Sequence, residues 1–380
     1  MIYMDNSATS YPKPETVTLA VKRALDGCVA NPGRSSHREA SRTAMAVYRV
    51  RERLADFVNT EPERVVFTYN ATMALNLALF GSLRKGDRVL TTPFEHNSVL
   101  RPLYRMEREG RITLDFLKVS TYDENVVCDD LLKHLDGDKK PTAVVMTHTS
   151  NVLGLRLPIE RIGAICKDKN VFFIVDGSQG LGSSRIDVEV CGIDILCTSG
   201  HKGLYGITGS GFMALSRKCR RELEPLLWGG TGIASREKGM PDGYPERLEA
   251  GTVGVVGIES LGAGVEYVTS VGCDTIAEKT KSLRKILTEG LSVIPRVRVY
   301  APESDSVSIV LFNIDGMSCD ETAVSLDGFD IASRGGFHCS PLAHSFLNTD
   351  GAVRLSASHF NTEAECQAVL SAISHITKGL

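Results

Sequence analysis

The sequence predicts an α/β protein whose main part is built on a largely parallel sheet of about seven strands. Short runs rich in β-branched and aromatic residues alternate with amphipathic stretches through the first two thirds of the 380 residues. Several runs are apolar at every position, as expected where helices cover both faces of a parallel sheet. The chain is longer than one hydrophobic core usually serves, so a second, smaller part is expected.

The expected elements follow one another in a regular order. Strands are expected at Val65–Tyr69, Arg88–Thr92, Ile112–Val119, Thr142–Thr147, Val171–Asp176, Asp194–Thr198 and Gly211–Leu215. Between them, apolar residues recur at helical spacings of three and four in Ala71–Leu83, Asn97–Glu109 and Ile159–Lys169. The stretch Ala234–Glu246, rich in Gly, Pro and charged residues, is expected to be an exposed loop of the larger part.

After Gly251 and Thr252 the pattern becomes that of a smaller α+β domain. Helices are expected at Gly257–Thr269, at Cys273–Leu291, from Asp320 and at Thr362–Lys378, with strands at Val297–Tyr300 and Ser308–Ile314. We therefore expect residues 14–255 to form a large domain, and residues 1–13 together with 256–380 to form a small domain.

The composition argues against several classes of protein. There are 43 Lys and Arg residues against 46 Asp and Glu, with no run of like charge, which argues against nucleic-acid binding. The ten cysteines include no CxxC pair, so no zinc ribbon, other metal site or disulfide framework is expected. No signal-peptide pattern opens the sequence, and no apolar stretch reaches the roughly 20 residues of a membrane helix. We expect a cytoplasmic protein that acts on a small molecule and contacts no membrane.

Lys202 lies in an unusual setting for a surface lysine. It stands beside His201, between Gly200 and Gly203, just after the predicted strand Asp194–Thr198. This setting holds its side chain close to backbone at the ligand-binding edge of the sheet. A lysine there can form a Schiff base with an aldehyde cofactor.

Two further features suit pyridoxal phosphate, which needs such a lysine, an acid facing its pyridine nitrogen and a cradle for its phosphate. Asp176 ends the apolar strand Val171–Asp176 and would point into the crevice where open α/β sheets bind ligands. Thr72, at a strand-to-helix turn, would offer a hydroxyl beside free backbone N–H groups. Taken alone, each has a simpler interpretation: Asp176 as a turn residue, and the turn at Tyr69–Thr72 as a plain helix cap.

Longer motifs resemble a known family. Asp176-Gly-Ser-Gln179 followed by Ser199-Gly-His-Lys202 is similar to the class V aminotransferase group of fold-type I pyridoxal-phosphate enzymes. Six more segments resemble cysteine desulfurases, and most of all their SufS-like branch, namely Tyr3–Thr9, Glu95–Ser98, Thr149–Gly154, Glu249–Thr252, Arg334–Cys339 and Arg354–Thr362. The resemblance covers essentially the whole chain and implies the fold-type I architecture. One departure is Gly203, for which SufS-like enzymes usually have no equivalent residue.

The resemblance implies a role for each cofactor-binding residue. Lys202 would form the Schiff base and later move a proton, while Asp176 would keep the pyridine nitrogen protonated. Gln179 would bond the ring hydroxyl, and His96 would stack on the ring. Thr72, Ser199 and His201 would hold the phosphate. Thr252 would reach the same phosphate from the second subunit of a homodimer.

The resemblance also implies which groups bind the substrate. Asn151 and Arg354 would bind the substrate carboxylate, a planar anion suited to paired guanidinium donors. Arg334 is a further candidate for substrate binding. His37, with Arg34 of the same turn, either lines the substrate entrance or has a structural role.

Cys339 would be the nucleophile that takes the sulfur. It follows a Gly-Gly turn, with Arg334 and His338 near enough to favour the thiolate. Only 15 positions (354 − 339) separate it from Arg354, which leaves little chain to swing outward. A dedicated acceptor protein is therefore expected to collect the sulfur. Six other thiols are expected to be buried hydrophobes or incidental, namely Cys166, Cys191, Cys197, Cys219, Cys273 and Cys366.

Together these features predict a homodimeric pyridoxal-phosphate enzyme that converts L-cysteine to L-alanine and passes sulfur through Cys339 to an acceptor, as in iron–sulfur cluster assembly. Selenocysteine lyase and cysteine-sulfinate desulfinase would use the same cofactor residues, so both stay open. A class V transaminase or kynureninase-like hydrolase would need no cysteine at position 339, and a non-catalytic scaffold would not need Lys202.

Overall fold

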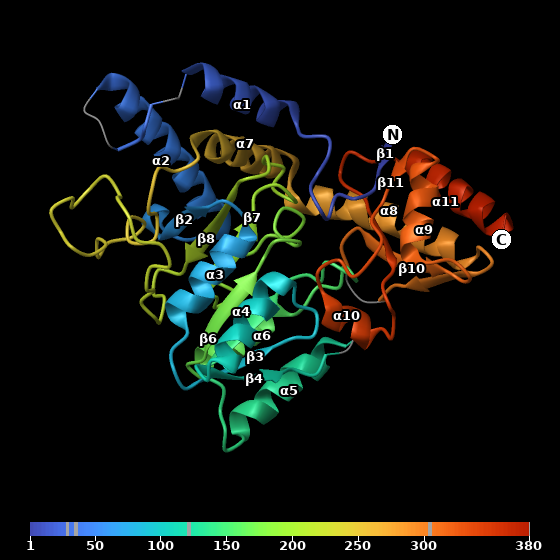
Figure 1. Ribbon diagram of the computed structural model, residues 1–380, viewed down its shortest axis with the longest axis horizontal. Coiled ribbons are helices and arrows are strands. Elements are labelled where there is room, and N and C mark those ends of the chain that lie inside the picture. The colour runs from blue at the N-terminus through green and yellow to red at the C-terminus, as the bar shows by residue number, and fades with distance from the viewer. Residues whose placement is uncertain (28–29, 34–36, 120–122, 303–305, 380) are drawn as a thin grey trace.

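A seven-stranded sheet forms the centre of the protein, as the sequence predicts. The computed structural model in Figure 1 describes residues 1–27, 30–33, 37–119, 123–302 and 306–379. The strands are β2 (Val65–Thr68), β3 (Asp87–Thr91), β4 (Ile112–Phe116), β5 (Ala143–Thr147), β6 (Phe172–Asp176), β7 (Ile195–Ser199) and β8 (Gly211–Leu215). Their order is β2-β8-β7-β6-β5-β3-β4, and β8 alone runs antiparallel to its neighbours β2 and β7.

Helices lie on both faces of this sheet (Figure 1). The helices of this part of the chain are α1 (Glu15–Gly27), α2 (Arg38–Val58), the short 3₁₀ helix η1 (Pro62–Arg64), α3 (Ala71–Ser82), α4 (Asn97–Arg108), α5 (Glu124–Asp136), α6 (Ile159–Asp168) and α7 (Val255–Val271), and α1 packs on α7. The sequence predicted α3, α4, α6 and α7, but not α1, α2 and α5. In the described part of the chain, no helix combines the length and apolar character needed to cross a membrane.

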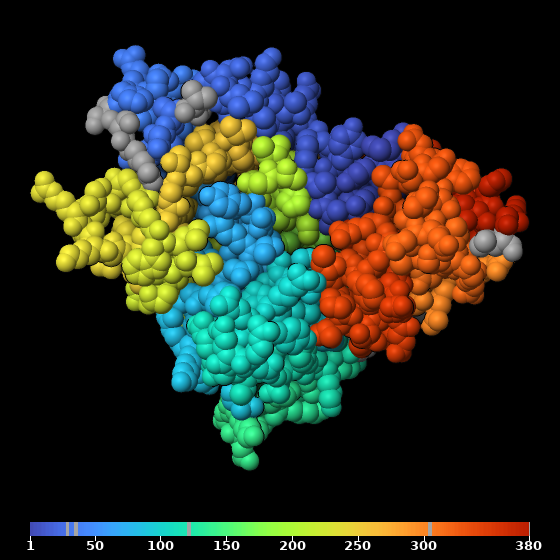
Figure 2. Space-filling view, in the orientation of Figure 1, coloured from blue at the N-terminus to red at the C-terminus, as the bar shows by residue number. Residues whose placement is uncertain are grey.

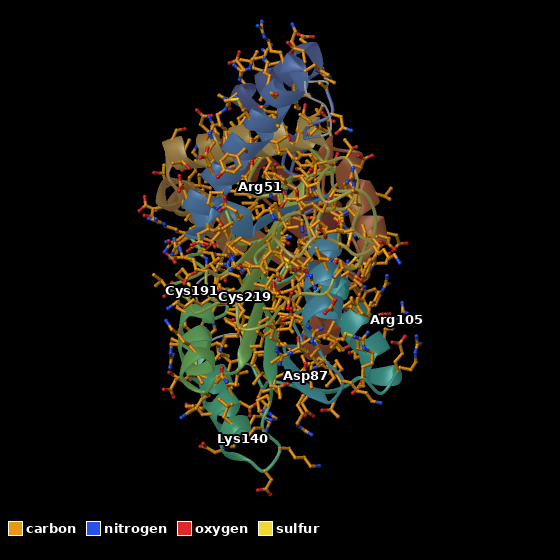
Figure 3. The ribbon with its side chains drawn as sticks, turned by 90° about the vertical axis from the view of Figure 1, so that its left-hand side faces the viewer. Arg51, Asp87, Arg105, Lys140, Cys191 and Cys219 are labelled. Carbon is orange, nitrogen blue, oxygen red and sulfur yellow. The ribbon has the colours of Figure 1, made fainter. Side chains whose placement is uncertain are left out.

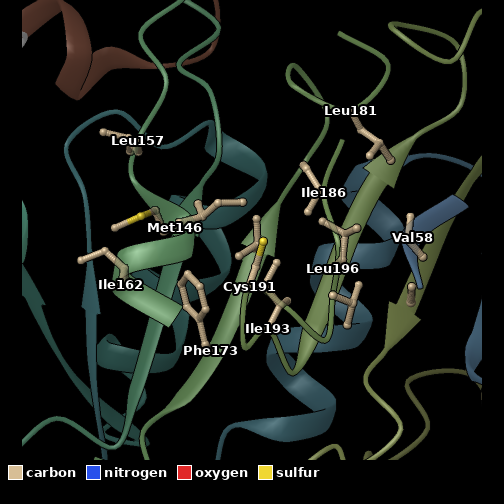
Figure 4. Packing of buried hydrophobic residues seen from close by; sticks show 14 of the residues in the cluster. Val58, Met146, Leu157, Ile162, Phe173, Leu181, Ile186, Cys191, Ile193 and Leu196 are labelled. Atoms are coloured by element: carbon tan, nitrogen blue, oxygen red, sulfur yellow. The ribbon is translucent and has the colours of Figure 1, made fainter. Parts of the chain in front are cut away.

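The strand β6 shows why the central strands are apolar at every position. Successive side chains of a strand point to opposite faces. Phe173 and Val175 therefore pack in one core cluster with residues of α2, α6 and α7, while Phe172 and Ile174 pack in another with α3 and α4. Figure 4 shows Phe173 beside Ile162 of α6 in the first cluster. Each such buried side chain contributes roughly 1.5–3 kcal/mol to folding.

A smaller α+β part follows. Its elements are α8 (Cys273–Ser292), β9 (Val297–Tyr300), β10 (Ile309–Ile314), α9 (Cys319–Asp327), β11 (Ile331–Ala332), α10 (Pro341–Phe346), β12 (Val353–Ser356) and α11 (Glu363–Lys378). The strands β12, β10 and β9 form an antiparallel sheet, and β1 (Ile2–Tyr3) pairs in parallel with β11. Met4 packs in the core of this part, so the first residues of the chain lie against it, and the assignment of residues 1–13 to the small domain stays a prediction.

The division of the chain at residues 255 and 256 stays a prediction. The helix α7 packs on α1 and α2, and its Ile258 and Leu261 join the core of the large sheet. By contrast, Leu283 and Leu287 of α8 join the core of the small sheet. Packing thus attaches α7 to the large sheet, although its sequence lies in the segment that we assigned to the small domain.

A buried ion pair ties the long loop after β8 to the large domain. Arg51 of α2 forms paired hydrogen bonds of 2.9 Å with both carboxylate oxygens of Glu249, and each side chain is 8% exposed. Glu249 also accepts a hydrogen bond of 2.6 Å from the Phe67 N–H, and Arg51 donates to the Val65 carbonyl. Figure 3 shows Arg51 among the packed side chains. The pair fixes the start of the turn Glu249–Thr252 against β2.

Glu249→Ala should lower the free energy of unfolding by about 3–5 kcal/mol, because it leaves the Arg51 guanidinium buried without its counter-ion. Denaturant titration of the variant and the parent measures the difference. Glu109→Ala serves as the control, since it removes an exposed pair with Arg105 at the surface (Figure 3) and should leave the unfolding midpoint in place. Equal effects of the two substitutions would contradict the assigned importance of the buried pair.

Candidate active site

Three neighbouring strands end at one edge of the large sheet and carry the centre of the site. Thr147 at the end of β5 pairs with Asp176 at the end of β6, and Asp176 pairs with Cys197 near the end of β7. A cavity of about 230 Å³ lies over this edge. Ten of the thirteen predicted site residues line it: Thr72, His96, Asn151, Asp176, Gln179, Ser199, His201, Lys202, Arg334 and Arg354. The other three are Cys339, Thr252 and His37.

Asp176 is held in one orientation by its own loop. Its Oδ1 accepts hydrogen bonds from the Ser178 N–H at 3.0 Å and from the Ser178 hydroxyl at 2.5 Å. The side chain is 5% exposed and lines the cavity, as expected for an acid that faces a ligand, and this role stays a prediction. Gln179 nearby donates from Nε2 to the Ser7 carbonyl at 2.9 Å, which joins this loop to the N-terminal segment.

Lys202 reaches the cavity from the loop after β7. Burial lowers its pKa to about 8, and the negative charge of Asp176 partly opposes this shift. The preceding residue is fixed by the N-terminal segment, because the His201 carbonyl accepts hydrogen bonds from the Ser10 N–H and from Lys13 Nζ, each at 3.0 Å. An amine with a lowered pKa is more often unprotonated near neutral pH, which is what a nucleophilic or proton-transferring lysine requires.

Close backbone packing explains why a glycine follows Lys202. A Cβ atom placed on Gly203 would lie 2.3 Å from the Leu181 carbonyl oxygen, and one placed on Gly182 would lie 2.2 Å from the Gly203 carbonyl oxygen. The two backbones therefore touch directly. Gly203, for which SufS-like enzymes usually have no equivalent, fits here because both Gly203 and Gly182 lack a side chain at this backbone contact.

The polar atoms of the cavity test whether a phosphate fits. Ser199 Oγ and His201 Nδ1 are buried, and neither has a hydrogen-bond partner among the described residues. Since buried polar atoms are nearly always partnered, these two atoms are suited to bind a polar group such as a phosphate. Thr72 lies in the first turn of α3, whose cap is Asn70, so the Thr72 hydroxyl does not cap the helix. That hydroxyl instead lies 2.7 Å from Ser98 Oγ.

His96 is both a helix cap and a cavity wall. Its Nδ1 accepts a hydrogen bond of 3.0 Å from the Ser98 N–H at the start of α4, which fixes the ring. Burial, followed by the positive charge of Lys202, lowers the pKa of His96 to about 4. Burial likewise lowers the pKa of His201 to about 4. Both rings are therefore neutral near pH 7.

Arg354 lies 1% exposed at the side of the cavity formed by the smaller part. Its Nη2 donates to Asp5 Oδ1 at 2.8 Å, and its Nη1 donates to the Asn151 carbonyl at 3.0 Å. Its Nε is buried and has no partner among the described residues. Arg334 lies beside it, paired with Arg354 through backbone hydrogen bonds. The two guanidinium groups give this wall of the cavity a positive charge that suits a carboxylate.

Cys339 is exposed and lies next to the cavity rather than in its wall. Arg334 Nη2 is 3.9 Å from its sulfur, so this arginine lies beside the thiol as the sequence predicts. The expectation for His338 is wrong in one respect. Burial, and then the charge of Arg354, lowers the pKa of His338 to about 3, so the ring carries no positive charge near pH 7.

Two predicted residues lie away from the cavity. Thr252 is exposed, and its hydroxyl accepts a hydrogen bond of 3.1 Å from Asn31 Nδ2. Thr252 is predicted to contact the phosphate bound in a second subunit, and this contact stays a prediction. His37 is exposed and caps α2, where its Nδ1 accepts from the Ala40 N–H at 3.2 Å. Arg34 lies outside the described residues.

Glu95 is a buried acid next to His96 of the cavity wall, and the sequence did not indicate its role. It is fully buried, and its Oε1 accepts hydrogen bonds from the Thr92 hydroxyl at 2.6 Å and from the Thr147 N–H at 2.9 Å. Burial raises its pKa to about 8, with a smaller contribution from the charge of Asp176. Glu95 is therefore mostly protonated near pH 7. Its position in the motif Glu95–Ser98 was the only signal.

These observations fit pyridoxal phosphate. The buried atoms Ser199 Oγ and His201 Nδ1 suit its phosphate, and the fixed carboxylate of Asp176 suits its ring nitrogen. The lowered pKa of Lys202 suits an amine that attacks an aldehyde.

The amine of Lys202 in the cofactor-free protein should react with formaldehyde and cyanoborohydride with a midpoint near pH 8, because only the unprotonated amine attacks. Asp176→Asn should move this midpoint to lower pH, since it removes the charge that favours the ammonium form. Lys13 is the internal control: burial alone lowers its pKa to about 8, so its midpoint should stay in place. Peptide mass mapping follows both lysines. A Lys202 midpoint that is unchanged in Asp176→Asn would contradict the assigned proximity.

Comparisons with known proteins agree with this geometry. Residues 2–369 match the family model described as Aminotransferase class-V. The chain is 33% identical to a protein named "Probable cysteine desulfurase" from Pyrococcus abyssi, covering 100% of this chain and 95% of that protein. It is 32% identical to one of the same name from Methanothermobacter thermautotrophicus, covering 99% and 94%.

Solved structures give the same result. The apo structure of cysteine desulfurase from Thermococcus onnurineus superposes with a TM-score of 0.92 at 33% identity, covering 100% of this chain and 95% of that one. The cysteine desulfurase CsdA (S-sulfonic acid) from Escherichia coli gives a TM-score of 0.87 at 25% identity, with the same coverage. The predicted fold class is therefore confirmed. The chain belongs to the class V aminotransferase family of pyridoxal-phosphate-dependent enzymes.

Proposed function

We propose that this protein removes sulfur from L-cysteine and releases L-alanine, with Cys339 as the residue that takes the sulfur. The observation that carries the proposal is an exposed thiol beside the cavity that holds Lys202 and Asp176, with an arginine nitrogen 3.9 Å from its sulfur. A transaminase or kynureninase-like hydrolase needs no thiol at this position. The relatives named cysteine desulfurase support the same conclusion.

Pyridoxal phosphate, when bound, supplies an electron sink that weakens the bonds at the α-carbon of an amino acid. Lys202 would bind its aldehyde carbon, and Asp176, fixed by Ser178, would face its ring nitrogen. His96 would lie on the ring face and Gln179 near the ring hydroxyl. The phosphate would be bound by the cavity residues Thr72, Ser199 and His201.

The substrate carboxylate would bind on the arginine wall. Arg354 Nε is buried and lacks a partner among the described residues, so it is a donor in a suitable place. Arg334 adds a second positive charge, and the Asn151 amide lines the same cavity. These groups would orient the amino acid so that its side chain points toward Cys339.

Lys202 and Cys339 would then carry out the proton and sulfur transfers. Lys202, with its pKa near 8, can both accept and return a proton at the α-carbon. The Cys339 thiolate would attack the substrate sulfur, so that a sulfur–sulfur bond forms as the carbon–sulfur bond breaks. The electron pair of the broken bond takes up a proton at carbon. The products are L-alanine and a persulfide on Cys339, and no external oxidant or reductant is consumed.

The persulfide must next pass to an acceptor, and an acceptor protein suits the exposed position of Cys339. Selenocysteine and cysteine sulfinate are the alternative substrates, because they would use the same cofactor and carboxylate groups. The nine described cysteines are free thiols, which supports a reducing, cytoplasmic compartment.

A homodimer would complete the site. The segment after β8 projects from the body of the molecule at the left of Figures 1 and 2. It exposes large apolar side chains: Leu226 by 41%, Leu227 by 45%, Trp228 by 66% and Ile233 by 51%. Exposed apolar groups on a projecting loop favour a protein interface. Thr252, near the end of the same segment, would reach the phosphate of the second subunit.

Cys339→Ala should abolish L-alanine release from L-cysteine while keeping the visible absorbance of the bound cofactor. Lys202→Ala should lose both, because it removes the group that binds the cofactor covalently. Alanine release and absorbance are measured on the same preparations. Cys339→Ala should retain turnover of cysteine sulfinate, whose leaving group needs no thiol. Cysteine turnover that persists unchanged in Cys339→Ala would refute the proposed function.

The double variant Leu227→Glu with Trp228→Glu should sediment as a monomer and bind pyridoxal phosphate at least about tenfold more weakly, because each site would lose the residue supplied by its partner. Analytical ultracentrifugation and cofactor titration measure the two effects. The control is Val293→Glu, which places the same charge on an exposed apolar residue, 80% exposed, of the smaller part. A monomer with full activity at assay concentration would exclude the composite site.

A further inference from the structure

The loop that carries Cys339 has an unusual backbone. The Ser340 N–H donates to the Phe337 carbonyl at 2.9 Å, which closes a β-turn with His338 and Cys339 at its centre. These two residues have φ angles of 52° and 58°. Positive φ at both central positions is the pattern of a type I′ turn, which favours glycine and asparagine. Neither residue is either of these, so the turn costs free energy and persists only because its surroundings hold it.

Asn151 holds the turn from the large domain. Its Nδ2 donates to the His338 carbonyl at 2.7 Å, and its Oδ1 accepts from the Ser340 hydroxyl at 2.7 Å. One amide thus binds the residues on both sides of Cys339. Asn151 is 7% exposed and Ser340 is fully buried, so water competes little for these bonds.

A pair of histidines holds the turn from the smaller part. His338 Nδ1 is 3.2 Å from His344 Nε2, and His344 Nδ1 is 2.8 Å from the Thr349 hydroxyl. The other ring nitrogen of His338 is 3.0 Å from the Arg334 carbonyl. The rings stack with centroids 5.4 Å apart, and they are 2% and 0% exposed. Every ring nitrogen of the pair is thereby partnered.

The same turn is attached to the wall of the cofactor cavity. The Cys339 carbonyl accepts a hydrogen bond of 2.8 Å from the N–H of Asn97, the first residue of α4. The preceding residue, His96, caps that helix and lines the cavity. A displacement of the turn would therefore change the place of Cys339 relative to the cavity.

We infer that Ser340 and His344 are positioning residues, which act through Asn151 and His338 to hold Cys339 in its strained turn at the distance needed for sulfur transfer. This inference rests on the proposed function, because it concerns the nucleophile of that reaction. It assigns a role to two residues that do not themselves line the cavity but contact two residues that do, Asn151 and His338.

The test uses the cofactor-loaded variants Ser340→Ala and His344→Gln, with Ser345→Ala and His375→Gln as controls at exposed positions. Both test variants should form the Cys339 persulfide from L-cysteine at least about tenfold more slowly. They should keep cysteine-sulfinate turnover within about twofold and the cofactor absorbance unchanged. The backbone amide of residue 340, which closes the turn, should exchange hydrogen at least about tenfold faster in both variants, because the turn opens more often. The controls should match the parent in every measurement.

Each outcome is decisive. The inference would be overturned if persulfide formation and hydrogen exchange at residue 340 proceed at parental rates in both test variants. It would also be overturned if turnover of L-cysteine and of cysteine sulfinate fell equally, because this indicates general damage to the site. If the parent lacks sulfinate turnover, hydrogen exchange and cofactor absorbance decide instead. If Cys339→Ala retains cysteine turnover, the proposed function fails. The claim that Ser340 and His344 stabilise the turn is tested separately: it fails if the backbone amide of residue 340 exchanges at the parental rate in both test variants.

Discussion

Burial of the Arg354 guanidinium is the constraint on which the rest of the site depends. A charge removed from water must be paired, and removing one partner of such a pair typically costs several kcal/mol. Arg354 meets this requirement with Asp5 from the N-terminal segment and the Asn151 carbonyl from the large domain, while its own backbone belongs to the small sheet. Three separate parts of the chain therefore meet at one side chain. Its backbone also pairs with Arg334, which places the loop of Cys339 at the same junction.

Burial also decides which groups of the site carry charge. The low pKa values of His96, His201 and His338 keep these rings neutral near pH 7, so they act as hydrogen-bonding and packing groups. The raised pKa of Glu95 removes a second negative charge from the neighbourhood of Asp176. The guanidinium groups of Arg334 and Arg354 remain as positive charges in the cavity wall. Such a division suits a cofactor and a substrate that both carry negative charge.

The large sheet could be predicted in detail because its strands are apolar on both faces, a pattern that local sequence carries. The helix α2 was missed although its apolar residues face the core, and β12 was missed because its four residues give too short a periodic signal. The cavity residues were identified from motifs, whereas their partners were not. Asp5 and Arg354 are 349 positions apart, and Asn151 and Ser340 are 189 apart, so only the folded chain relates them. The neutral state of His338 could not be predicted from the sequence either, because it depends on the burial of the ring in the folded protein.

The contact between Gly182 and Gly203 has an evolutionary consequence. Each backbone occupies the space that a side chain on the other would need, so a methyl group at either position would displace the loop of Lys202. The extra residue after the lysine is thus tolerated only together with a glycine 21 positions earlier (203 − 182). Lineages that retain the insertion are expected to inherit both glycines as a unit.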